Sequence, residues 1–135
     1  MSAPRRFSFP SRLRLRRRAE FQRVMDQGER AGDQRLQVWA LPNHLDHARL
    51  GLVVGRQHGN AVRRHRIKRI LREAFRLSRE NLPTGFDLAC APRVGATIEL
   101  PEAIESLTRV AKRLARRVAN DQHEPRPASV RAEEA

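Results

Sequence analysis

Aromatic residues are scarce in this chain of 135 residues: they make up 4% of it, and tyrosine is absent. Proteins that bind single strands without sequence preference stack the bases on several aromatic side chains. The chain has too few aromatic residues for such a platform. Lysine is also scarce, because 26 of the 28 basic residues are arginine. Against 15 acidic residues this gives a net charge of +13, carried almost entirely by guanidinium groups.

Cys90 is the only cysteine. A single thiol excludes an internal disulfide framework and a zinc site built on paired cysteines, and it favours a reducing, cytoplasmic location. No uncharged apolar run reaches the roughly 18 residues of a membrane helix, and no apolar stretch follows the arginine-rich start as it would in a secretory signal. We therefore expect a protein that neither spans a membrane nor is exported, and that has no membrane partner.

The positive charge is concentrated in two blocks. The first 18 residues contain seven arginines and no acid, and residues 56–79 contain nine basic residues and one acid, Glu73. The rest of the chain has a net charge of −2. Two dense blocks on a nearly neutral scaffold are typical of a protein that binds a polyanion. The alternative is a solvated charged helix face without a partner.

The periodicity of the apolar residues predicts one domain over residues 12–119. Residues 1–11 are expected to form a mobile basic arm and residues 120–135 a disordered tail, since both are rich in proline and polar residues. Cys90 is expected to pack inside the last strand. The elements that the residues predict are a helix over 18–27, strands over 35–41, 50–54 and 86–91, and a helix that begins near Pro101 and continues to Val118.

The expected fold class is α+β, an α/β sandwich. Three helices would pack on a small central sheet of about four strands, in the order α-β-β-β-α-β-α. The strand over 35–41 alternates, so that Leu36, Val38 and Ala40 face one way. Gln37 and Trp39 face the other way, together with Arg35.

The residues after Asn60 are predicted to form an amphipathic helix. On a helical wheel the apolar residues occupy one arc and the basic residues another, and only Arg63 and Arg66 in the first turns break the pattern. The arc expected to pack contains Ile67, Ile70, Leu71, Ala74, Leu77 and Ser78. The arc expected to face solvent contains Arg64, His65, Lys68, Arg69, Arg72, Arg76 and Arg79.

This helix is suited to binding a phosphodiester backbone. Arg64, Lys68 and Arg72 recur every fourth residue, so they are spaced by about 6 Å, close to the distance between neighbouring phosphates of one strand. Asn60 can cap the helix, and the N–H groups of the first turn offer a phosphate site. Arginine favours structured RNA through bidentate phosphate contacts and base stacking. DNA is less favoured because the pattern contains neither a helix-turn-helix nor a zipper.

The same residues resemble a known family. The run Gly59-Asn60-Ala61-Val62, then Arg64, Arg66-Ile67-Lys68-Arg69 and Arg72-Glu73 resembles the arginine-rich signature of the bacterial ribonuclease P protein subunit. Residues 12–24 are similar to the first helix of that family. Residues 51–54 and 86–88 are similar to the strands before and after the signature. Altogether the resemblance covers residues 13–117.

The resemblance implies a function and partners. In that family the protein binds a large catalytic RNA, and the two together remove the 5′ leader of precursor tRNA by metal-dependent hydrolysis, so that the RNA performs the endoribonuclease chemistry. It implies ribonuclease P RNA and precursor tRNA as partners, magnesium bound mainly by the RNA, no small-molecule cofactor, and a βαβ crossover of the uncommon left hand. The residues that it implies at or near the RNA interface are Arg56, Asn60, Arg64, His65, Arg66, Lys68, Arg69 and Arg72.

The resemblance also implies a cleft for the leader, lined by Phe21, Met25, Gln37 and Trp39. Because Trp39 lies on the polar side of its predicted strand, stacking on a base or sugar is favoured there. For Phe21, ordinary core packing is the alternative. His65 stands where the family usually has Asn, and Met25 replaces a common aromatic residue.

Catalysis by this chain alone is not expected. His44, Asp46 and His47 lie within four residues and could hold a metal ion, but a polar turn is the simpler interpretation. The leading hypothesis is therefore the protein subunit of ribonuclease P. The alternative is a ribosomal or assembly-type protein that binds structured RNA and has no role in cleavage.

Overall fold

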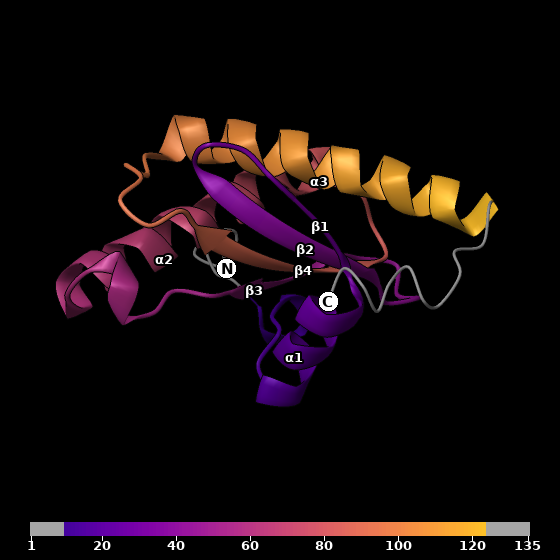
Figure 1. Cartoon of the computed structure of the whole chain (residues 1–135), viewed down its shortest axis with the longest axis horizontal. Helices are drawn as coiled ribbons and strands as arrows, with labels where there is room; N and C mark the ends of the chain where they lie inside the picture. The colour runs from indigo at the N-terminus through magenta and orange to yellow at the C-terminus, as the bar shows by residue number, and fades with distance from the viewer. Residues whose placement is uncertain (1–9, 124–135) are drawn as a thin grey trace, which may run out of the picture.

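Three helices and a four-stranded sheet make up the part of the protein that the computed structural model describes, residues 10–123 (Figure 1). Side chains are described up to Ala119. Most of the arm and tail expected from the sequence, residues 1–9 and 124–135, lie outside the described residues. The helices and strands are α1 (Arg18–Gln27), β1 (Glu29–Gly32), β2 (Leu36–Pro42), β3 (Arg49–Leu52), α2 (Ala61–Ser78), β4 (Phe86–Pro92) and α3 (Leu100–His123).

The strands are ordered β1-β2-β4-β3 in the sheet. β1 pairs antiparallel with β2 and β2 antiparallel with β4, whereas β3 and β4 are parallel neighbours. α2 connects these two parallel strands, so the expected βαβ crossover is present. The order of helices and strands and the α+β class are confirmed, and the left hand of the crossover stays a prediction.

The sheet separates two apolar clusters. On one face, α2 and α3 pack against Leu36, Val38 and Ala40 of β2 and against Leu88 and Cys90 of β4. On the other face, α1 packs through Val24, and Trp39 belongs to this second cluster. Figure 1 shows α1 and α3 on opposite sides of the strands. The alternation predicted for β2 is thus confirmed.

The last helix packs as its periodicity predicts, but it is longer than expected. Pro101 lies in its first turn, and α3 continues to His123, so the tail does not begin at Asn120. The buried residues of α3 include Ala103, Leu107, Val110, Ala111, Leu114 and Val118.

Two further parts of the chain differ from the prediction, which gave no range for the strand β1. β1 has no alternating apolar pattern, since it reads Glu-Arg-Ala-Gly, and it is a strand because it pairs with β2 at the edge of the sheet. Ser11, assigned to the mobile arm, begins a 3-10 turn that ends at Leu13. Leu13 is 1% exposed, and its burial holds this turn against the core.

The buried arc of α2 is rotated from the one predicted. Phe75, which was given no place on either arc, is 0% exposed, whereas Leu77 is 49% exposed. Because α2 contacts both β3 and α3, the side chains that face these two elements are the ones that are buried. The rotation brings the buried arc closer to Arg64, Lys68 and Arg72, which are consequently half-buried.

Cys90 is buried as expected, and burial raises the pKa of its thiol to about 12. A thiol with so high a pKa is protonated at neutral pH and is a poor nucleophile. Among residues 10–123, no helix has the length and apolarity needed to cross a membrane.

Asp33 connects the β1–β2 turn to α3. Its Oδ1 accepts hydrogen bonds from the N–H groups of Arg35 and Leu36, both at 2.9 Å, and its Oδ2 lies 2.6 Å from Nη2 of Arg109. Burial alone would raise the pKa of Asp33. Hydrogen bonds from Leu36, Ser106, Arg35 and Arg109 outweigh burial and lower this pKa to about 2.

We expect Asp33→Asn to lower the free energy of unfolding at pH 7 by about 2 kcal/mol. Because the pKa is depressed from 3.8 to about 2, the stabilisation by the charged form is present above about pH 4 and is lost as the pH falls to about 2. Urea unfolding between pH 7 and pH 2 measures the effect, with Asp26→Asn on the exposed side of α1 as the control. A wild type–variant difference that does not change with pH would contradict this account.

Candidate nucleic-acid interface

The start of α2 is held in place by a short anchored loop. Oδ1 of Asn60 accepts the N–H of Arg63 at 2.9 Å, so the predicted N-cap is confirmed. Gly59 has a φ of 118°, and a Cβ there would lie 2.5 Å from Cδ of Arg63. His58 is buried, with Nε2 2.8 Å from the carbonyl oxygen of Pro92, and its Nδ1 accepts the N–H of Gly55 at 3.0 Å. These contacts fix the position of the first turn.

The two basic residues that break the amphipathic pattern both have partners. Nε of Arg63 donates to the carbonyl oxygen of His58 at 3.0 Å, so its side chain turns back around the helix start as expected. Arg66 lies 3.4 Å from Glu99, just before α3. Arg76, predicted to be on the solvent-facing arc, forms an ion pair with Glu73 at 2.6 Å. Arg79 lies beyond the end of α2.

The other basic residues gather on one side of α2, and we call this set the basic face. Arg64, Lys68 and Arg72 are half-buried along its inner edge, whereas His65 and Arg69 are exposed. None of the five has an ion pair with a described residue. A groove of about 720 Å³ borders this face, lined by Val62, His65, Arg66, Arg69, Ile70, Arg72, Glu73, Arg76 and Leu100.

Two arginines of the basic face are in unusual environments. Nε of Arg64 is buried and has no hydrogen-bond partner in the described part of the chain. Buried donors nearly always have an acceptor. Burial lowers the pKa of Arg72, and the positive charge of Arg14 lowers it further. An acceptor that carries negative charge would satisfy Arg64 and relieve the repulsion between Arg72 and Arg14.

The predicted interface residues lie at the start of α2 and along its length, and the exposed Arg56 lies in the short turn before it. They are not equivalent: Asn60 caps the helix, and Arg66 is partnered by Glu99. Arg56 lies outside α2, and the other five of the eight residues make up the basic face. Their role in RNA binding stays a prediction.

The four residues expected to bind the leader share the face of the sheet that α1 covers. Phe21, Met25 and Trp39 pack in one cluster, and each is half-buried. The ring of Phe21 lies against Gly51, where a Cβ would be 2.5 Å from Cε1 of the ring. Gln37, two positions from Trp39 on β2, is also half-buried. We call these four residues the aromatic face. Phe21 therefore contributes to packing, and its part in a leader cleft is untested.

Among the described side chains, no group of three or more His, Cys, Asp or Glu could hold a metal ion. The polar turn near His47 instead makes local contacts, with Nδ1 of His47 2.8 Å from Oδ1 of Asp46 and Nε2 3.3 Å from the carbonyl oxygen of Arg12.

An ion-pair network that the sequence pattern did not predict lies on the same face as α1. Arg49 of β3 lies between Glu20 of α1 and Asp87 of β4, at 3.3 and 2.7 Å. Glu20 is the first acid after the arginine-rich start, and Asp87 is an acid in an apolar strand. Asp87 was the signal in the sequence that could have revealed the network, because a charge inside an apolar strand usually has a partner of opposite charge.

Comparison with known proteins now identifies the family. The profile described as Ribonuclease P matches residues 9–121. The chain belongs to the ribonuclease P protein family. Its relatives include the ribonuclease P protein component of Thermotoga petrophila, which is 43% identical over 86 residues, 64% of this chain and 74% of that protein. That of Desulfovibrio desulfuricans is 39% identical over 112 residues, 82% of this chain and 83% of that protein.

Solved structures of ribonuclease P proteins share the fold. The protein from Thermotoga maritima superposes with a TM-score of 0.69 at 33% identity, over 74% of this chain and 96% of that one. The protein from Staphylococcus aureus gives a TM-score of 0.66 at 31% identity, over 74% of this chain and 93% of that one. The family resemblance expected from the sequence is confirmed.

We expect the double substitution Arg64→Ala and Arg72→Ala to weaken binding of ribonuclease P RNA without unfolding the protein. If each arginine contacts one phosphate, the slope of log affinity against log salt should fall by about 1.4–1.8. Filter binding over a range of salt concentrations measures the slope. Lys112→Ala with Arg116→Ala removes the same charge from exposed positions of α3 and is the control. An equal loss in both double variants would contradict a specific role for the basic face.

Proposed function

We propose that this ribonuclease P protein binds the catalytic RNA through the basic face of α2 and the 5′ leader of precursor tRNA through the aromatic face. In this proposal the complex makes the endonucleolytic cut that matures the 5′ end of tRNA. The observation that carries it is the basic face itself, where Arg64 has a buried donor without a partner among the described residues and Arg72 lies beside another positive charge.

The proposal assigns the hydrolysis to the RNA and a supporting role to the protein. Magnesium would be bound mainly by the RNA. The guanidinium groups of the protein would reduce the repulsion between two polyanions, the enzyme RNA and its substrate, and so favour metal occupancy at the RNA active site. The proposal also includes a cytoplasmic location, where tRNA precursors are available.

The leader would distinguish precursor from mature tRNA. Trp39 lies on the aromatic face, half-buried, and an aromatic side chain stacks on any base without sequence preference. Such binding suits leaders of varied sequence. The alternative function, binding of structured RNA without a role in cleavage, is not favoured, because the relatives that match most of the chain are named as ribonuclease P protein components.

Reconstitution tests the proposal directly. We expect that a bacterial ribonuclease P RNA at low magnesium, combined with this protein, cuts precursor tRNA at the mature 5′ end, and that neither component does so alone. Protein that binds the RNA without changing cleavage would support the structured-RNA alternative. Cleavage by the protein alone would overturn the assignment of chemistry to the RNA.

The aromatic face has its own test. We expect Trp39→Ala to reduce the preference of the complex for precursor over mature tRNA by at least about fivefold, since a base stacked on an aromatic ring contributes about 1–3 kcal/mol. Trp39→Phe keeps a ring and should retain most of the preference. Competition binding with leader-bearing and leaderless tRNA measures it, and thermal unfolding checks that both variants fold. An unchanged preference in Trp39→Ala would remove the aromatic face from the leader site.

A further inference from the structure

The arginine-rich stretch of residues 12–17, which we call the arginine segment, runs beside the edge strand β3. Arg14 forms a parallel bridge with Leu50, and the N–H of Leu15 donates to the carbonyl oxygen of Leu50 at 2.9 Å. Leu13 and Leu15 are 1% and 5% exposed. The segment is therefore attached to the sheet by its main chain and by its two leucines.

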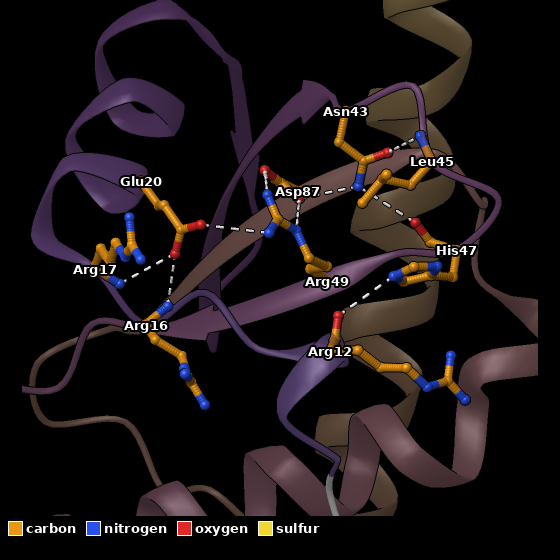
Figure 2. Close-up of polar contacts among 9 residues, drawn as sticks. All are labelled: Arg12, Arg16, Arg17, Glu20, Asn43, Leu45, His47, Arg49 and Asp87. Atoms are coloured by element: carbon orange, nitrogen blue, oxygen red, sulfur yellow. Dashed lines mark hydrogen bonds and ion pairs between the residues drawn. The ribbon is translucent and has the colours of Figure 1, made fainter.

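An ion-pair network holds the end of the arginine segment that leads into α1 (Figure 2). Oε1 of Glu20 accepts the N–H groups of Arg16 at 2.9 Å and Arg17 at 3.0 Å. Oε2 of Glu20 lies 3.3 Å from Nη1 of Arg49. Arg49 binds Asp87 in a bidentate way, through Nε at 2.8 Å and Nη2 at 2.7 Å. A path of charge-assisted contacts thus links the segment to β3 and β4.

The same network extends to the other end of the segment. Nδ2 of Asn43 donates to Oδ1 of Asp87 at 2.9 Å and to the carbonyl oxygen of His47 at 3.3 Å. Nε2 of His47 in turn lies 3.3 Å from the carbonyl oxygen of Arg12. The arginine segment is thus held at both ends. The two sets of contacts meet at Asp87, which binds both Arg49 and Asn43 and whose side chain is 8% exposed.

These contacts use main-chain atoms of the arginines. Glu20 binds the N–H groups of Arg16 and Arg17, and His47 binds the carbonyl oxygen of Arg12. In Figure 2 the side chains of Arg12 and Arg16 point away from Asp87, and both residues are exposed. Arg14 is exposed as well, and its charge acts on Arg72 of α2. The two blocks of positive charge, far apart in sequence, therefore meet beside β3.

We propose that the arginine segment is a second strip for RNA phosphates, continuous with the basic face of α2, and that Glu20 is the positioning residue that keeps its main chain in place. The inference rests on the proposed RNA-binding function. Fixing the main chain lowers the entropy cost of ordering the arginines on a phosphodiester backbone. This role also explains why two acids, Glu20 and Asp87, lie beside a surface proposed to bind a polyanion. Both acids belong to the network that holds the arginine segment in place.

The sign of the effect tests the proposal. Removing an acid from a protein that binds RNA should strengthen binding if only net charge matters. We expect Glu20→Ala to weaken binding of a bacterial ribonuclease P RNA about fivefold and to lower the salt slope by about 0.7–0.9, equivalent to one lost phosphate contact. Glu20→Gln removes the same charge but keeps an oxygen acceptor for the two N–H groups, so it should retain more affinity. Glu80→Ala, in the exposed turn after α2, is the charge control.

Two further measurements make the outcome decisive. In Glu20→Ala the amide protons of Arg16 and Arg17 should exchange faster, while circular dichroism and the melting temperature show that the fold is kept. In a background in which Arg12, Arg14, Arg16 and Arg17 are all replaced by alanine, Glu20→Ala should have no further effect on affinity. If Glu20→Ala binds RNA as tightly as Glu80→Ala does, the positioning role is overturned while RNA binding stands. If the wild type itself fails to bind this RNA, the proposed function fails instead.

Discussion

The packing of α2 between β3 and α3 is the constraint on which the rest of the structure depends. Ile67, Leu71, Ala74 and Phe75 are buried in the main core, so this helix cannot rotate without exposing them. The positions of the basic residues on the other side follow from that packing. A helix with so many like charges would be poorly stable by itself, and the apolar arc offsets their repulsion.

The electrostatics of the protein depend on where acids are placed as much as on where arginines are. Arg66 and Arg76 have carboxylate partners, whereas Arg64, Lys68 and Arg72 have no ion pair with a described residue. On the other side of the sheet, Glu20 accepts main-chain N–H groups of the arginine segment directly, and Arg49 links Glu20 to Asp87. Acids therefore neutralise some basic residues of α2, whereas Arg64, Lys68 and Arg72 keep their charge without a carboxylate partner among the described residues.

The two faces of the sheet differ in how completely helices cover them. The face covered by α2 and α3 contains the larger core, and the face covered by α1 keeps Phe21, Met25 and Trp39 half-buried. Because α1 is short and is the only helix on its side among the described residues, side chains there remain accessible. The sheet thus joins a stable core to a surface suited to ligand binding.

The elements with strong periodicity, including α1, β2 and α3, could be predicted from the sequence. So could the family, from the arginine-rich run after Asn60. The sequence could not determine β1, whose only reason to be a strand is its partner β2, or the arc of α2 that buries Phe75 and exposes Leu77. It also could not join Arg14 to Arg72 or Glu20 to Arg49. Periodicity reports which residues of one element share a side, whereas these contacts join residues distant in the chain, and only tertiary packing brings them together.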